Sequence, residues 1–377
     1  MATKHEQHIA VFGERGSGKT VLLSTLFGVS GDPEVIEEAG HRVVAMDVGQ
    51  GERLRSMYLG MKTDHRAPRS TSFTSDAYRF ELRPVKDEAV ETKEVVGLVW
   101  HDYPGEWFEA TPDSTEQESR RVATFRNLMS SHVALLLVDA QRLADHHDEE
   151  GRYLKGLFAN YTNALAALRN DILEDGERLS QFPRIWTVAL SKADILPDMT
   201  ADGLRDLITL RAPGTLAELR AAISEFVAEP DALSVGEDYV LLSSGRFDPD
   251  VIDLRKRIGL DLLFPIATML PFQRYLRWDG QVEKLGKKAV RLAHNVSEMG
   301  KKLDLALDHL PAVPRWANSV VKVIGFGQLV APLAESQFQK ILDQAETKHQ
   351  PLRAMLARFG LALERGKKSG VLRESEQ

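Results

Sequence analysis

Gly13-Glu14-Arg15-Gly16-Ser17-Gly18-Lys19-Thr20 (GERGSGKT) is the most informative motif in the sequence for the fold of this chain. Residues 8–12 (HIAVF) before it are typical of a short buried strand, and residues 21–27 continue as a helix. The glycines permit backbone conformations that are closed to other residues, so successive N–H groups can turn inward around a phosphate at a helix N-terminus. We expect Lys19 to reach the β- and γ-phosphates and the Thr20 hydroxyl to ligate Mg²⁺. The stretch predicts a nucleoside triphosphate site rather than a glycine-rich turn that carries Lys-Thr by chance.

Composition indicates an ordinary globular protein. The chain has 377 residues, of which 43% are hydrophobic and 27% charged, and a prior of about 150 residues per domain predicts two units. The lack of cysteine excludes disulfides, zinc-thiolate sites, iron–sulfur clusters and a cysteine nucleophile. Residues 1–8 lack the apolar run of a signal peptide, and no window reaches about 18 uninterrupted apolar residues. We expect a soluble, cytoplasmic protein.

Charge is divided unevenly along the chain. The net charge is −7, yet residues 280–377 hold 16 Lys and Arg against 10 Asp and Glu, so residues 1–279 carry −13. An acidic front disfavours nucleic-acid binding, and the basic tail is either a solvated helical face or a surface for an anionic partner. We predict a nucleotide-binding domain at 1–270 and a helical tail at 280–377.

The first half of the chain alternates predicted strands and helices. A polar connector at 31–40, a strand at 42–48 and a helix at 51–62 predict an insertion at about 31–65. After another strand at about 73–82, an apolar strand delivers Asp102 at its carboxyl end, and Gly105 follows three residues later. We expect Asp102 beside the Mg²⁺ and the Gly105 N–H beside the γ-phosphate.

Later strands are expected to carry residues that read the base. Helices are predicted at 116–131 and 149–173, and buried strands at 134–139 and 185–190. Ser191-Lys192-Ala193-Asp194 follows the second of these strands. The Lys192 stem can lie over a purine, while the Asp194 carboxylate can accept from the N1–H and the exocyclic amine of guanine, a donor pair that adenine lacks. The last predicted strand, 239–242, leads into Ser243-Ser244-Gly245, whose N–H groups can approach the guanine carbonyl.

These motifs, in this order, resemble those of the translation-factor-related and Ras-like P-loop GTPases over residues 6–265. The resemblance implies a three-layer α/β fold with a mostly parallel sheet and helices on both faces, and hydrolysis of GTP to GDP with Mg²⁺. The run DYPGEW, 102–107, is similar to that of bacterial YcjX-like GTPases, and the inserted strand and helix resemble bacterial double-GTPase families of conflict and signalling systems. The nucleotide contacts that the motifs imply are Gly13, Arg15, Gly16, Ser17, Gly18, Lys19, Thr20, Val21, Gly105, Ser191, Lys192, Asp194, Ser243, Ser244 and Gly245.

A few positions are expected to determine Mg²⁺ binding, the rate of hydrolysis and base recognition. The switch threonine that ligates Mg²⁺ in these relatives maps to Thr71 or Thr74. Glu106 stands where many relatives have the Gln that orients the attacking water, and a carboxylate there is repelled by the γ-phosphate, so hydrolysis is expected to be slow or to need a partner's cation. Arg15 is either an internal arginine finger or a residue that turns to solvent or pairs with an acid such as Glu14. Ser191 replaces the usual Asn or Thr of the base-reading motif, and its hydroxyl can still bridge to the phosphate loop.

The tail is predicted to be helical. Apolar residues recur at heptad spacing from Val282 to Leu310, residues 311–314 (PAVP) end that helix, and a second series runs from Phe338 to Phe359 with a kink at Pro351. The pattern predicts either a hairpin or bundle packed on the first domain, or a coiled-coil arm for a homodimer or another protein. Residues 316–333 are apolar enough to lie on a membrane but carry charges that argue against spanning one.

Two further features have local explanations. His146 and His147 are adjacent, so their side chains diverge, which predicts a polar helix start rather than a metal site. Trp107 and Phe108 are either core residues or an anchor for a partner.

We expect a Mg²⁺-dependent GTP-binding switch with slow GTPase activity, in which the catalytic residues are Lys19, Glu106, Thr71 and Arg15. The alternatives are an ATP-dependent P-loop kinase or assembly ATPase, and a dynamin-like membrane GTPase.

Overall fold

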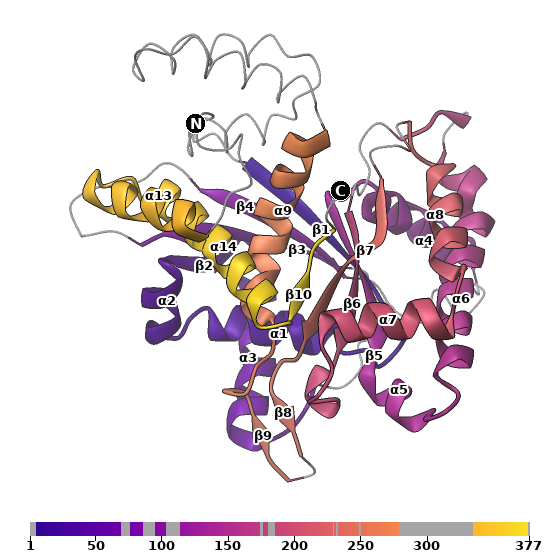
Figure 1. Cartoon of the computed structure of the whole chain (residues 1–377), viewed down its shortest axis with the longest axis horizontal. Helices are drawn as coiled ribbons and strands as arrows, with labels where there is room; N and C mark the ends of the chain where they lie inside the picture. Colours follow the sequence, from indigo (N-terminus) through magenta and orange to yellow (C-terminus); the bar gives the residue numbers. More distant parts are fainter. Residues whose placement is uncertain are drawn as a thin grey trace.

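An eight-stranded sheet forms the centre of the molecule, in the order β10-β7-β6-β5-β1-β4-β3-β2 (Figure 1). The computed structural model describes residues 5–68, 76–85, 95–102, 114–173, 176–179, 185–228, 230, 233–248, 250–278 and 335–375. The strands of this sheet are β1 (His5–Phe12), β2 (His41–Ala45), β3 (Asp76–Pro84), β4 (Val96–Asp102), β5 (Val133–Asp139), β6 (Ile185–Ser191), β7 (Ser234–Leu242) and β10 (Leu372–Arg373). A separate pair consists of β8 (Arg246–Phe247) and β9 (Ile252–Asp253).

Helices connect most of these strands. In the described part of the chain they are α1 (Lys19–Val29), α2 (Pro33–Ala39), α3 (Val48–Asp64), α4 (Thr115–Met129), α5 (Ala140–Asp145), α6 (Glu150–Ile172), α7 (Ala201–Arg211), α8 (Thr215–Ser224), α9 (Leu263–Trp278), α13 (Glu335–Thr347) and α14 (Pro351–Lys368). Short 3₁₀ turns lie at η3 (Ala193–Ile195) and η5 (Leu260–Leu262).

Strand direction determines where the loops meet. β1 pairs in parallel with β4 and β5, β5 with β6, and β6 with β7, whereas β2–β3, β3–β4 and β7–β10 are antiparallel pairs. The carboxyl ends of β4, β1, β5, β6 and β7 therefore share one edge of the sheet. In open α/β sheets this edge is where ligands bind.

Successive side chains of each strand point to opposite faces of the sheet and so contribute to two hydrophobic cores. On β1, Ile9 and Val11 face one hydrophobic cluster, and Ala10 and Phe12 face the other. The first cluster includes residues of α1, α3, α9, α13 and α14, and the second includes residues of α4, α6, α7 and α8. Helices thus cover both faces of a mostly parallel sheet, and the α/β fold expected from the sequence is confirmed.

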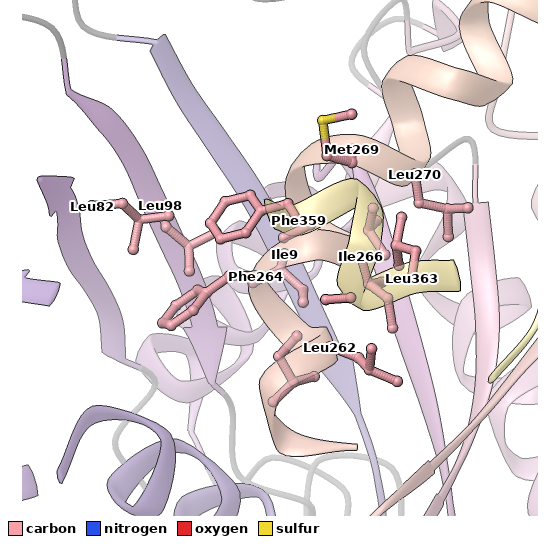
Figure 2. Packing of buried hydrophobic residues seen from close by; sticks show 14 of the residues in the cluster. Ile9, Leu82, Leu98, Leu262, Phe264, Ile266, Met269, Leu270, Phe359 and Leu363 are labelled. Atoms are coloured by element: carbon pink, nitrogen blue, oxygen red, sulfur yellow. The ribbon is translucent and has the colours of Figure 1, made fainter. Parts of the chain in front are cut away.

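The C-terminal helices pack on the first of these faces. Phe359 and Leu363 of α14 lie in the same cluster as Ile9 and Leu98 of the sheet, with α9 residues such as Phe264 beside them (Figure 2). After α14 the chain turns at Gly370, where φ is +71°, and β10 pairs with β7 through Leu372 and Val240. The division into 1–270 and 280–377 stays a prediction, and the first heptad series and residues 316–333 lie outside the described residues.

The structure corrects several element boundaries. The connector predicted at 31–40 contains α2, with Pro33 at its first turn. Val48, expected in a strand, begins α3, because the Asp47 carboxylate accepts from the Gln50 N–H at 2.7 Å and caps the helix. The segment from Phe338 to Phe359 forms two helices rather than one kinked helix, since His349 has a φ of +51° and Pro351 starts α14. β7 begins at Ser234 rather than at 239, and β10 was not expected.

Candidate functional site

The predicted phosphate loop lies between β1 and α1, at the carboxyl edge of the sheet. Gly16 and Gly18 have φ values of +81° and +90°, and Gly18 is the residue before the first turn of α1. A side chain at either position would be strained by the backbone, whereas a Cβ at Gly13 would collide with the Ser17 hydroxyl. Each glycine of the motif therefore has a physical reason, and the loop presents the N-terminus of α1 to a ligand.

Lys19 is folded back over this loop. Its ammonium donates to the Gly13 carbonyl at 2.6 Å and to the Glu14 carbonyl at 3.1 Å. These bonds hold a buried cation over the loop at the place where polyphosphate charge is expected. An ammonium group has three N–H donors, and these can also hydrogen-bond to phosphate oxygens.

Two predicted oxygen ligands for Mg²⁺ belong to neighbouring elements. Thr20 is the second residue of α1, and Asp102 is the last residue of β4, the strand paired with β1. The register aligns Ala10 with His101, so Asp102 follows directly at the edge where the phosphate loop begins. A hydroxyl and a carboxylate are hard oxygen donors of the kind that Mg²⁺ prefers, so this donor set fits the ion.

Lys192 is fixed beside β5. It has a left-handed φ of +54°, and its ammonium lies 2.6 Å from the Asp139 carboxylate at the end of β5. Asp139 is nearly inaccessible, with 4% of its side chain exposed, whereas Lys192 is 35% exposed. The lysine is thus held at its charged end while about a third of its side chain remains exposed.

Asp194 is held by the turn after β7. The Ser243 hydroxyl donates to Asp194 Oδ1 at 2.6 Å, and the Phe247 N–H donates to Oδ2 at 3.3 Å. A carboxylate has about four lone-pair sites, so both oxygens keep capacity for two further donors. The two parts predicted to read guanine, Lys192/Asp194 and the 243–245 turn, therefore lie in contact. Ser244 and Gly245 are buried beside them, and Gly245 is packed against the backbone of Asp253 and Leu254.

Ser191 and Arg15 differ in their surroundings. The Ser191 hydroxyl donates to the Val138 carbonyl of β5 at 3.2 Å. Arg15 is exposed, and the acid next to it, Glu14, pairs with Arg142 of α5 at 2.6 Å. Val21 is half-buried on α1.

Sequence reasoning missed two residues of this site, Asp139 and Arg142. Asp139 ends a fully buried strand and Asp102 a largely buried one, and that parallel was the available signal. Arg142 had no sequence signal, because its contact with Glu14 spans 128 positions. Thr71, Thr74, Gly105, Glu106, Trp107 and Phe108 lie outside the described residues.

Histidines gather near the site without forming a recognisable metal centre. Among the described residues, no group of three or more His, Cys, Asp or Glu side chains is arranged to hold a metal ion. His8 Nδ1 lies 3.0 Å from His101 Nε2, and burial, assisted by His8 and Arg79, lowers the pKa of His101 to about 4. His146 contacts the Arg142 carbonyl, whereas His147 contacts Glu150, so the adjacent pair diverges.

The described helices include none that is long and apolar enough to span a membrane. Residues 316–333 lie outside the described residues.

Comparison with known proteins identifies a family. The family model described as Double-GTPase 2 matches residues 7–237, more than half of the chain. No curated protein matches. Among solved structures, Methanosarcina barkeri Roco2 RocCORdC bound to GDP is similar at 12% identity, covering 97% of this chain and 91% of that chain, with a TM-score of 0.25. A score this low supports no conclusion about the present chain.

Proposed function

Because the chain belongs to the Double-GTPase 2 family, we propose that it binds GTP with Mg²⁺, hydrolyses it slowly to GDP, and acts as a switch for a protein partner or for self-assembly. The observation that carries the proposal is the shared sheet edge. The phosphate loop after β1 and the Lys192/Asp194 segment after β6 flank the end of β5. One nucleotide can therefore contact both.

In this proposal different residues bind different parts of the nucleotide. The loop N–H groups and Lys19 bind the phosphates, and Thr20, Asp102 and Thr71 hold Mg²⁺, which neutralises charge on the phosphates when bound. Asp194, oriented by Ser243 at 2.6 Å, accepts from guanine. The Lys192 stem covers the base, and the Ser243–Gly245 turn approaches its carbonyl.

Hydrolysis is proposed to be slow because of Glu106. Water attacks the γ-phosphorus, the bond to the β–γ bridging oxygen breaks, and GDP and phosphate leave. Glu106 follows the γ-phosphate-sensing Gly105 and carries a negative charge that the γ-phosphate repels, so it orients water poorly unless a cation lies beside it. Turnover of Glu106→Gln and Glu106→Ala tests this role. Equal turnover in both variants and the wild type would remove Glu106 from the chemistry.

Calorimetric titration with GTP, GDP and ADP, with and without Mg²⁺, tests the function itself. We expect GDP and GTP to bind and ADP binding to be negligible. Tight ADP binding with negligible GDP binding would replace the proposal with an ATP-dependent enzyme, and turnover stimulated by liposomes would favour the membrane GTPase. Sizing in each nucleotide state then tests self-assembly. A role in bacterial stress or conflict systems is part of the proposal on the basis of two resemblances, that of residues 102–107 and that of the inserted strand and helix.

A further inference from the structure

The Ser191 hydroxyl hydrogen-bonds to β5 and, in the described part of the chain, makes no hydrogen bond to the phosphate loop. This hydroxyl, which is expected to bridge from the base-reading segment to the phosphate loop, donates instead to the Val138 carbonyl on the neighbouring strand. A different element contacts both parts. It is α5, the short helix that directly follows β5.

α5 contacts the base side through its first turn. Asp139, its N-cap, accepts from the Gln141 N–H at 2.9 Å and from the Lys192 ammonium at 2.6 Å. One carboxylate thus starts the helix and holds the lysine that is proposed to cover the base. The pair is charge-assisted and lies at a largely buried acid, which makes it stronger than a surface pair.

α5 contacts the phosphate side one turn later. Arg142 donates from Nη1 to Glu14 Oε2 at 2.6 Å and from Nη2 to the Arg15 carbonyl at 3.4 Å. Only 9% of the Glu14 side chain is exposed, whereas 38% of Arg142 is. Glu14 is a nearly buried anion within the loop that is proposed to receive polyphosphate, so its charge opposes binding unless a cation neutralises it.

The helix is itself anchored from behind. The Tyr153 hydroxyl of α6 accepts from the Asp139 N–H at 3.0 Å, and the Tyr153 ring stacks on His146 with centroids 6.0 Å apart. His146 in turn contacts the Arg142 carbonyl at 2.7 Å. Both ends of α5 are therefore fixed to α6, so the helix can act as a rigid support.

We propose that α5 positions both halves of the nucleotide site, and that Arg142 is the positioning residue of the phosphate loop through its neutralisation of Glu14. The inference rests on the proposed function, because the ligand is the same nucleotide. The new element is that the affinity for phosphate depends on the ion pair between Arg142 of α5 and Glu14 of the phosphate loop. Arg142 acts through Glu14 and the Arg15 carbonyl.

A double-mutant cycle tests the inference by calorimetric titration with GDP and GTP. Arg142→Met removes the ion pair between Arg142 and the largely buried Glu14 carboxylate and is expected to weaken binding by about tenfold or more. Glu14→Gln/Arg142→Met removes both charges and is expected to bind within about threefold of Glu14→Gln alone. Arg142→Lys, which keeps the charge but not the forked geometry, should fall between the wild type and Arg142→Met. Arg152→Met is the matched control, since Arg152 pairs with Glu149 in an exposed position on α6.

Two results would overturn the inference. One is unchanged nucleotide affinity in Arg142→Met. The other is a Glu14→Gln/Arg142→Met protein that binds more than about tenfold more weakly than Glu14→Gln, which would separate Arg142 from Glu14. The comparison of Glu14→Gln/Arg142→Met with Glu14→Gln can still be made if the single variant Arg142→Met does not fold. If the wild type binds ADP instead of GDP, the proposed function fails, and the same cycle with ADP still tests Arg142, because the phosphate loop does not read the base.

Discussion

The Lys192 ammonium and the Asp139 carboxylate form an ion pair of 2.6 Å that joins the ends of β6 and β5. Lys192 needs a left-handed backbone, with φ at +54°, to reach this position. Such a conformation costs a non-glycine residue about 1 kcal/mol or more. The surrounding contacts therefore hold the lysine in one place before any ligand arrives, which favours binding through preorganisation.

Replacing Asp139 tests that preorganisation. Asp139→Asn keeps an oxygen to cap α5 but removes the charge that holds Lys192, so we expect GDP affinity to fall by about three- to tenfold. Titration calorimetry measures the change. Asp145→Asn is the control, because Asp145 lies exposed on the same helix and accepts from the Gln141 side chain. An unaltered affinity in Asp139→Asn would mean that Lys192 is positioned by other contacts.

Asp194 is expected to determine base specificity. In Asp194→Asn an amide N–H₂ donor replaces one carboxylate acceptor. This donor faces the exocyclic amine of guanine, which is also a donor, so the two groups cannot hydrogen-bond. Xanthine carries a carbonyl at the same carbon, and that carbonyl can accept from the amide. We expect GDP affinity to fall by about 100-fold and xanthosine diphosphate to bind in its place. Competition of the two nucleotides for each protein measures the exchange.

Asp198→Asn is the matched control for this substitution, since Asp198 is exposed four residues further along. Retained preference for GDP over xanthosine diphosphate in Asp194→Asn would exclude Asp194 from base recognition.

Two helical glycines have opposite predicted responses to the same substitution. A Cβ at Gly360 of α14 would overlap the ring of Phe338 on α13, whereas a Cβ at Gly156 of α6 meets no atom within 4 Å. Gly360→Ala is expected to lower the free energy of unfolding by about 1–3 kcal/mol, and Gly156→Ala to raise it by about 0.5–1 kcal/mol. Urea unfolding of both variants measures these changes. Stabilisation by Gly360→Ala would contradict the close packing of the two helices.

His41 is expected to make stability depend on pH. Its ring lies edge-on to Phe264 and Phe359, and burial, aided by Arg358, lowers its pKa below 6.5 against the opposing bond to the Ala39 carbonyl. The unfolded chain then binds the proton more readily, so the stability due to neutral His41 is present above about pH 6.5 and is lost as pH falls toward the folded pKa.

The measurement compares unfolding free energies at pH 7 and pH 5. His41→Leu should show a smaller loss on acidification than the wild type, by at most about 1.4 kcal/mol per pH unit for one site. His147→Gln, at an exposed position, should keep the wild-type slope. An identical slope in His41→Leu would assign the acid sensitivity to other groups.

The features that depend on local physics could be predicted from the sequence. The glycines around Gly16 and Gly18, the buried strand 133–139 and the long apolar stripe of 150–172 each follow from backbone sterics or from hydrophobic periodicity, so the α/β fold and the strand-loop-helix of the phosphate loop could be predicted. Which charged side chains pair with one another became evident from the three-dimensional structure. Arg142 neutralises Glu14, Asp139 holds Lys192, and β10 returns to pair with β7. These contacts join residues 53 to more than 120 positions apart, and nothing in local spacing encodes them.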